Sequence, residues 1–117
     1  MKKILVADDE MSIRLLYSEE LKEEGYEVYQ AANGREALDI VNKVPLDLVI
    51  LDIKMPEMDG IEALRQIKEQ RPDLPVVLST AYGEYKQDFA TWASDEYLVK
   101  SSDLDDLKAV VKRYLEK

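Results

Sequence analysis

Five side chains that could take part in chemistry stand where strand-like segments of the sequence end. They are, in chain order, Asp8, Asp9, Asp52, Thr80 and Lys100. Each lies at or just beyond the end of a mainly apolar stretch, as expected when a buried parallel strand emerges at the carboxyl edge of a sheet. Because the ligands of open α/β sheets collect beyond that edge, we expect three carboxylates, a hydroxyl and an ammonium group to meet there.

The three carboxylates indicate a site for a hard divalent cation. Clustered negative groups repel one another, and a bound cation removes that repulsion. The chain has no cysteine and no histidine, so oxygen atoms are the metal ligands that it offers. Mg²⁺ suits such an all-oxygen site, and its expected ligands are Asp8, Asp9, Asp52 and the backbone carbonyl of Lys54.

The expected chemistry at this edge is the transfer of a phosphoryl group. With the cation bound, Asp52 can attack phosphorus while Mg²⁺ and Lys100 neutralise the oxygens of the transferred group. Thr80 can then donate a hydrogen bond to the product. A Mg²⁺-dependent phosphohydrolase would also use Asp52 as its nucleophile. That alternative needs a second acid two residues later, where the chain has Lys54.

Alternating strand and helix patterns must bring these groups together. Apolar runs predict strands at residues 3–7, 27–31, 47–52, 75–79 and 96–99. Helical spacing of apolar residues predicts a helix after each strand, the fourth of them over residues 82–93. This alternation implies an α/β fold with a parallel sheet, right-handed crossovers and helices on both faces. The length of 117 residues suits a single domain, residues 1–117.

Capping residues mark the expected ends of several helices. Ser12 is expected to cap the first helix, and Gly25 stands where a left-handed C-terminal cap belongs. Asn33 and Glu36 have the spacing of a capping box. Asp103 is expected to cap the last helix.

The charge balance excludes some partners. Lys and Arg number 16 and Asp and Glu number 25, so the formal net charge is −9. Such a chain repels phosphate backbones and anionic lipid surfaces, and we expect no direct nucleic-acid or membrane binding. The apolar runs are too short to span a membrane, and the first residues lack the pattern of a signal peptide. A cytoplasmic location is therefore expected.

Over essentially its whole length, the sequence resembles a known family, the receiver domains of two-component response regulators. The resemblance is carried by ILVADDE, LVILDIKMPEMDGIEAL, VVLSTAYGE and EYLVK. It implies a flavodoxin-like (βα)5 fold with strand order 2-1-3-4-5. The segments QAANG, LDIV, LDIKMPEMDGIE and STAYGE are especially similar to single-domain regulators of the sporulation phosphorelay type. Such a domain accepts a phosphoryl group from phosphohistidine and catalyses only its own phosphorylation and dephosphorylation, so it is not otherwise an enzyme.

The resemblance also implies a role for each residue at the carboxyl edge. Asp52 matches the phosphorylated aspartate and Lys100 the phosphate-binding lysine. Asp9 matches a direct Mg²⁺ ligand, and Asp8 matches a ligand that acts largely through water. The family usually has proline directly after the lysine, whereas this chain has Ser101.

Two further positions match the family's conformational switch. Thr80 corresponds to the switch hydroxyl and Tyr97 to the switch aromatic residue. Movement of Thr80 toward the phosphoryl group would free space for Tyr97. The expected output surface is then the face formed by residues 82–93, the strand 96–99 and the last helix.

The resemblance implies protein partners on both sides of the phosphoryl transfer. The phosphoryl donor would be a histidine kinase or a histidine phosphotransferase. The downstream partner would be an output domain or an output protein. The apolar face of the first helix is wider than packing on a sheet requires, so Leu15 is a candidate docking residue for the donor. The remaining alternative is a receiver-like interaction module that is never phosphorylated.

Overall fold

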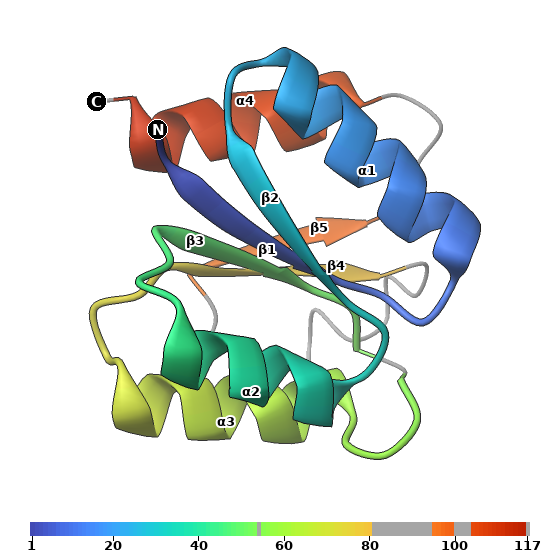
Figure 1. The fold of residues 1–117 in the computed structure, drawn as a ribbon, viewed down its shortest axis with the longest axis vertical. Coiled ribbons are helices and arrows are strands. Elements are labelled where there is room, and N and C mark those ends of the chain that lie inside the picture. Colours follow the sequence, from blue (N-terminus) through green and yellow to red (C-terminus); the bar gives the residue numbers. More distant parts are fainter. Residues whose placement is uncertain (54, 81–94, 100–103, 117) are drawn as a thin grey trace.

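A five-stranded parallel sheet forms the middle of the molecule, and helices cover both of its faces (Figure 1). The computed structural model describes residues 1–53, 55–80, 95–99 and 104–116, with only the backbone described at Thr80, Tyr97 and Val99. The helix expected over residues 82–93 lies outside these ranges.

The described elements alternate between strand and helix for most of the chain. In chain order they are β1 (Lys3–Ala7), α1 (Met11–Glu23), β2 (Glu27–Ala31), α2 (Gly34–Lys43), β3 (Leu48–Leu51), α3 (Gly60–Gln70), β4 (Val76–Thr80), β5 (Glu96–Val99) and α4 (Asp105–Leu115). The strand order is β2-β1-β3-β4-β5, and each pair of neighbours is parallel. The expected fold class and strand order are thus confirmed.

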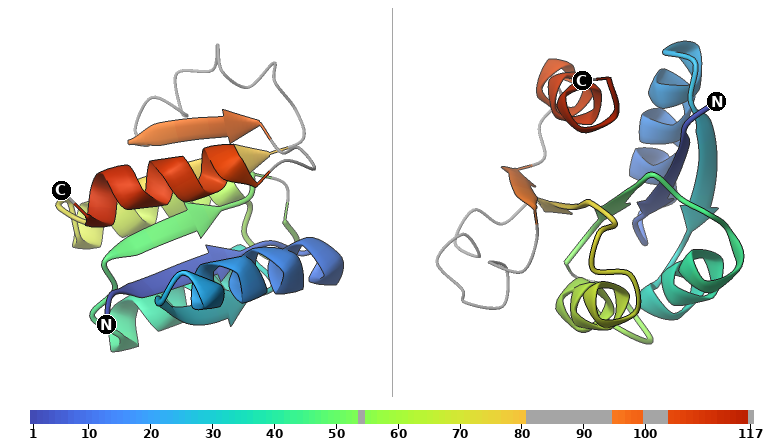
Figure 2. Two further views of the ribbon diagram at one scale, coloured as in Figure 1. Left: turned by 90° about the horizontal axis from the view of Figure 1, so that it is seen from above. Right: turned by 90° about the vertical axis from the view of Figure 1, so that its left-hand side faces the viewer.

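The sheet separates two apolar cores. Helices α2 and α3 cover one face, and α1 and α4 cover the other (Figure 2). Side chains of successive strand residues alternate between the faces. In the central strand β3, Val49 and Leu51 therefore pack on the α2 and α3 side, while Leu48 and Ile50 pack on the α1 and α4 side. All four are buried, which explains the continuous apolar run in this part of the sequence.

Two of the expected helix ends are confirmed by the backbone. Gly25 follows α1 with a φ of 97°, in the left-handed region that glycine adopts without a steric penalty. Asn33 precedes α2, and its side chain accepts a hydrogen bond of 2.9 Å from the Glu36 backbone N–H. The Glu36 carboxylate accepts one of 2.9 Å from the Ala32 backbone N–H. The capping box therefore forms, with its return bond shifted by one residue.

The expected cap at Ser12 is wrong. Helix α1 begins at Met11 and has Glu10 at its N-cap position, without a capping side chain. The reason lies in the preceding residues: the Asp8 carboxylate accepts a hydrogen bond of 2.9 Å from the Glu10 backbone N–H, which turns the chain before Ser12 is reached. At the last helix, Asp103 lies outside the described residues, and Leu104 occupies the N-cap position of α4.

None of the helices in the described part of the chain has both the length and the apolar character needed to cross a membrane.

Candidate functional site

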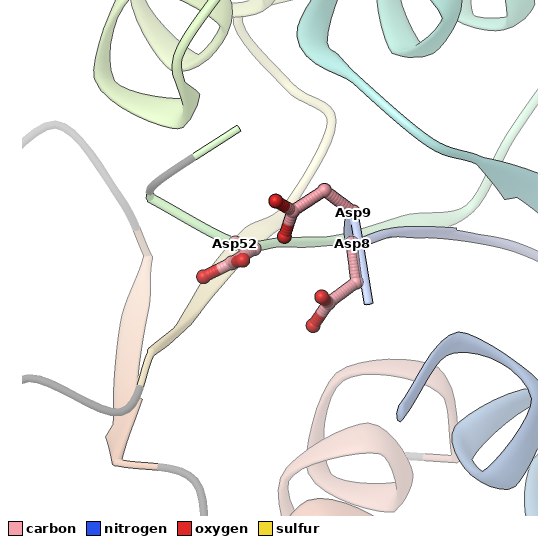
Figure 3. A group of neighbouring side chains, drawn as sticks. All are labelled: Asp8, Asp9 and Asp52. Carbon is pink, nitrogen blue, oxygen red and sulfur yellow. The ribbon is translucent and has the colours of Figure 1, made fainter. Parts of the chain in front are cut away.

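Three carboxylates gather at the carboxyl edge of β1 and β3. Asp8, Asp9 and Asp52 each offer one oxygen, and these oxygens lie within 4.8 Å of one another (Figure 3). The residues Asp8 and Asp52 are only 2% and 6% exposed, whereas Asp9 is exposed. Two of the three carboxylates are thus held in the protein and the third faces solvent, so a small ion or ligand could reach the cluster from outside.

The sheet itself sets the spacing of the two buried carboxylates. Ala7 of β1 pairs with Leu51 of β3, so the next residues, Asp8 and Asp52, lie side by side. The Asp52 backbone N–H donates a hydrogen bond of 2.9 Å to the Ala7 carbonyl, and the Asp8 backbone N–H donates one of 3.0 Å to the carbonyl of Ala31 in β2. Pairing therefore extends one residue beyond the strands and fixes the backbone beneath the carboxylates.

The first turn of α1 places further polar groups beside Asp8. The turn at Glu10 uses one oxygen of the Asp8 carboxylate, at 2.9 Å. The Arg14 guanidinium donates a hydrogen bond of 2.7 Å to the Asp8 backbone carbonyl. Sequence reasoning missed Arg14, although its position one turn into the helix could have suggested it. Asp8 is thus oriented through both its side chain and its backbone.

The loop after Asp52 is held close to two helices by glycines. At Gly60, the first residue of α3, an added Cβ would lie 1.9 Å from the backbone oxygen of Asp52. At Gly34, the first residue of α2, an added Cβ would lie 2.1 Å from the backbone oxygen of Met58. Both glycine N–H groups donate hydrogen bonds to the loop, to Ile53 at 2.7 Å and to Met58 at 3.0 Å respectively. These approaches require residues without a side chain.

The same loop contains a tight turn at Glu57. This residue has a φ of 70°, and the Met58 backbone N–H donates a hydrogen bond of 2.8 Å to the Pro56 carbonyl. The combination defines a γ-turn, which is uncommon and strained with a positive central φ. Asp59 then caps α3 by accepting a hydrogen bond of 2.9 Å from the Glu62 backbone N–H. The chain beyond Asp52 therefore follows a closely constrained path.

The remaining predicted site residues are described in part or not at all. Thr80 is the last residue of β4, and its Cα pairs with that of Val99. Tyr97 lies in β5, paired with Leu78. The side chains of Thr80 and Tyr97, and the whole of Lys54 and Lys100, lie outside the described part of the chain. The structure thus brings together the three predicted carboxylates and leaves the other predicted contacts untested.

An apolar patch occupies the first two turns of α1, the helix that follows Asp8 and Asp9 in the chain. We call the exposed side chains of Met11, Leu15 and Leu16 the α1 apolar patch, and their exposed fractions are 62%, 46% and 43%. The exposure of Leu15 and Leu16 agrees with the wide apolar face expected of this helix. Tyr17 and Leu21 occupy its buried face. Sequence reasoning also missed Met11, because the expected cap at Ser12 placed Met11 before the helix.

Fold, site and sequence together define the class of protein. The profile of the family described as response regulator receiver domain matches residues 4–112. The chain therefore belongs to the response regulator receiver domain family, and it is a signalling module rather than an enzyme with a separate substrate.

Among its relatives are one protein of similar length and one much longer protein. The chain is 44% identical to the sporulation initiation phosphotransferase F of Bacillus subtilis (strain 168), over 97% of this chain and 94% of that protein. It is 37% identical to the regulatory protein AtoC of Escherichia coli (strain K12), over 99% of this chain but 26% of that protein. The same domain thus occurs both nearly alone and as a small part of a longer chain.

Two solved structures of a Thermotoga maritima protein are close to this fold. One is the response regulator protein TrrA in complex with Mg²⁺-BeF, with a TM-score of 0.96 and 50% identity over 98% of this chain and 100% of that chain. The other is TrrA in complex with the histidine kinase ThkA, with a TM-score of 0.93 and 50% identity over 99% of this chain and 100% of that chain.

Proposed function

We propose that this receiver domain accepts a phosphoryl group on Asp52 from a phosphohistidine of a histidine kinase or histidine phosphotransferase. The observation that carries the proposal is the cluster of Asp8, Asp9 and Asp52, whose oxygens lie within 4.8 Å of one another at the carboxyl edge of the sheet. It is supported by the relative named as a sporulation phosphotransferase and by the TrrA complexes with Mg²⁺-BeF and with a histidine kinase.

The transfer uses the Asp52 carboxylate as the nucleophile. One of its oxygens forms a bond to phosphorus while the phosphorus–nitrogen bond of the donor breaks, and the donor imidazole leaves with the electron pair of that bond. The backbone of Asp52 is held by Ala7 and packed against Gly60, so the attacking group is oriented before the donor arrives. We propose that the positive charge of the Lys100 ammonium group neutralises the oxygens of the transferred phosphoryl group.

The donor set at this edge fits Mg²⁺. Two buried carboxylates and one exposed carboxylate give a hard, all-oxygen donor set, the kind of site at which Mg²⁺ keeps several waters and binds phosphoryl oxygens. When bound, Mg²⁺ supplies positive charge that offsets the carboxylates and the phosphoryl oxygens. Asp8, Asp9, Asp52 and the Lys54 carbonyl are the ligands that we propose.

We further propose that modification is transmitted through Thr80 and Tyr97. Thr80 ends β4 beside Val99 of β5, and Tyr97 lies in the same strand β5. A change at Thr80 can therefore act on the strand that carries Tyr97 and on the output face beside it. Amide NMR spectra recorded with and without beryllofluoride should show shifts in β5 and α4. Shifts confined to the loops around Asp52 would contradict this switch.

The test of the acceptor is chemical modification followed by mass spectrometry. Acetyl phosphate with Mg²⁺ should add one phosphoryl unit to the wild-type chain, and peptide mapping should place it on Asp52. Asp52→Asn should abolish the gain, because the amide is not a nucleophile toward phosphorus. Asp39→Asn is the matched control, since Asp39 is an exposed carboxylate on α2. An unmodified wild-type chain, beside a control regulator that is fully modified, would refute the proposal.

The α1 apolar patch is the proposed docking surface for the phosphoryl donor, with Leu15 as a contact residue. The patch is exposed and continues from the carboxylate edge, where the donor histidine must arrive. Leu15→Ala should slow transfer from a phosphorylated histidine kinase about tenfold, as for an apolar hot spot. Modification by acetyl phosphate should stay unchanged, because a small donor needs no docking surface. Lys22→Ala, at the other end of α1, is the control. Equal rates of transfer from the kinase to Leu15→Ala and to the wild type would refute the proposed docking role of Leu15.

The wider setting follows from the same assignment. We propose that the 117 residues act as one receiver domain in the cytoplasm. The signal then passes to an output domain or protein through the face that includes β5 and α4, without direct binding of nucleic acid by this chain, whose net charge is −9.

A further inference from the structure

A buried serine lies in the strand next to the proposed acceptor. Ser79 of β4 is only 2% exposed, and its Oγ has no hydrogen-bond partner among the residues that the structure describes. A buried hydroxyl left without a partner is costly, and native proteins seldom keep one without a reason. Ser79 is also distinct from Thr80, the hydroxyl that the sequence singles out.

Strand register places Ser79 beside Asp52. Leu51 of β3 pairs with Leu78 of β4, so the next residues in each strand, Asp52 and Ser79, are lateral neighbours. Asp8 is the neighbour of Asp52 on its other side, through the pairing of Ala7 with Leu51. Neighbouring strands lie about 4.8 Å apart, which is close enough for a group added to one side chain to reach the next.

The side chains of this row point to the same face of the sheet. Ile50 and Val77 belong to the core on the α1 and α4 side, and side chains two residues apart on a strand share a face. Asp52 and Ser79 therefore project to that side as well. Asp8 does so too, two residues after Val6, and Figure 3 shows its carboxylate directed toward α1 and α4. The row thus joins two buried carboxylates with one buried donor.

We propose that Ser79 donates a hydrogen bond to the aspartyl phosphate formed on Asp52, and so helps to hold the modified state. This inference rests on the proposed function. In the unmodified chain, the Ser79 hydroxyl is buried and has no hydrogen-bond partner among residues 1–53, 55–80, 95–99 and 104–116. Phosphorylation of Asp52 adds three acceptor oxygens next to it, so a group that is unfavourable in one state becomes satisfied in the other. Ser79 would then bias the domain toward phosphorylation through both states.

The proposal predicts opposite effects of one substitution in the two states. Ser79→Ala should raise the melting temperature of the unmodified protein, because it removes an unsatisfied buried hydroxyl. It should also weaken binding of beryllofluoride with Mg²⁺ about tenfold, the usual effect of losing one hydrogen bond to a charged group. Ser79→Thr keeps the hydroxyl and should retain most of the beryllofluoride affinity.

Ser18 provides a matched control in the same protein. Its Oγ is buried in α1, and it likewise has no partner among the described residues. Ser18→Ala should therefore raise the melting temperature of the unmodified protein and leave beryllofluoride affinity unchanged, since Ser18 is remote from the carboxyl edge of β3. The three variants and the wild type are compared by thermal unfolding with and without beryllofluoride and Mg²⁺.

The outcomes separate this inference from the proposed function. If beryllofluoride stabilises the wild type and Ser79→Ala equally, the Ser79 contact is refuted and the acceptor role of Asp52 stands. If beryllofluoride stabilises neither the wild type nor Ser18→Ala, the proposed function fails and the inference fails with it. A smaller stabilisation in Ser79→Ala alone supports the contact.

Discussion

At the scale of single residues, the candidate site depends on glycines as much as on carboxylates. Gly60 lies against the backbone of Asp52, and Gly34 lies against that of Met58, in each case with no room for a side chain. The backbone of the loop after β3 is therefore in close contact with the first residue of α2 and the first residue of α3. The position of the proposed nucleophile is therefore set partly by residues that have no chemistry of their own.

Replacement of Gly60 should disturb the site through the backbone. A Cβ at this position would lie 1.9 Å from the Asp52 oxygen and 2.8 Å from the Ile53 Cα, and backbone atoms cannot move aside as a flexible side chain can. We expect Gly60→Ala to lower the free energy of unfolding by roughly 2–4 kcal/mol and to slow modification of Asp52 by acetyl phosphate.

Gly25→Ala is the control for that experiment. Nothing lies within 4 Å of a Cβ at Gly25, and the cost there comes only from its φ of 97°. Urea unfolding should show a loss of about 1–2 kcal/mol for Gly25→Ala, with unchanged modification of Asp52. If Gly60→Ala is as mild as Gly25→Ala in both measurements, the close approach does not position Asp52.

At the scale of elements, Asp95 joins the start of β5 to three neighbouring segments. Its carboxylate accepts hydrogen bonds from the Lys68 ammonium of α3 at 2.6 Å and from the Val76 backbone N–H of β4 at 2.8 Å. Its backbone carbonyl accepts one from the Tyr114 hydroxyl of α4 at 2.8 Å. The edge strand β5, which carries Tyr97, is thus attached at its amino end.

Removal of the Asp95 carboxylate should therefore cost more than removal of a surface charge. We expect Asp95→Ala to reduce the free energy of unfolding by about 1–3 kcal/mol, because the Val76 N–H loses this acceptor and the Lys68 ammonium loses its ion-pair partner, keeping a backbone hydrogen bond of 2.8 Å to Leu74. Glu69→Ala breaks the exposed pair with Arg65 on α3 and should cost under about 0.5 kcal/mol. Similar midpoints for the two variants in urea would show that Asp95 is only another surface acid.

The elements were predictable where local signals and burial agree. The apolar runs gave β1, β2 and β5 with the bounds that the structure has, and Asn33 and Gly25 marked helix ends by their own backbone chemistry. The prediction of an N-cap at Ser12 was wrong because the Asp8 side chain, which was expected only to bind the metal, also forms the turn before α1.

The site was predictable in its carboxylates but not in their surroundings. Asp8, Asp9 and Asp52 could be placed together because parallel strands end at one edge. Ser79 was missed because a serine in a strand looks unremarkable until the register sets it beside Asp52. The tight contacts of Gly34 and Gly60 depend on how helices approach the loop, and sequence spacing alone does not report that distance.

At the scale of the whole molecule, the C-terminal end of α4 is fastened to the start of β2. The Tyr26 hydroxyl donates a hydrogen bond to the Glu116 carboxylate. The pKa of Tyr26 is raised from an ordinary value of 10.0 to about 12. Burial is the largest cause, and the hydrogen bond to Glu116 and the negative charge of that residue add to it. The native chain therefore keeps the phenol proton at pH values where the unfolded chain has released it.

This difference predicts an alkaline loss of stability. Between pH 10 and pH 12 the unfolded state binds fewer protons at Tyr26 than the native state, so the contribution of this residue is present below pH 10 and falls as the pH rises. We expect Tyr26→Phe to remove a pH-dependent component of roughly 1–2 kcal/mol from urea-unfolding curves recorded across that range. Parallel curves for the variant and the wild type would exclude Tyr26 as the source.

The turn at Gly25 has a practical consequence for reporter design. Since α1 carries the chain from the carboxyl edge back to the amino edge of the sheet, this turn lies at the opposite pole from Asp52. The chain contains no cysteine, so a thiol introduced by Glu24→Cys, at an exposed position, would be a unique attachment point for a fluorophore. A dye tethered there would leave the acidic pole and the α1 apolar patch uncovered, and a binding assay could then follow kinase capture by the tumbling rate of the labelled domain.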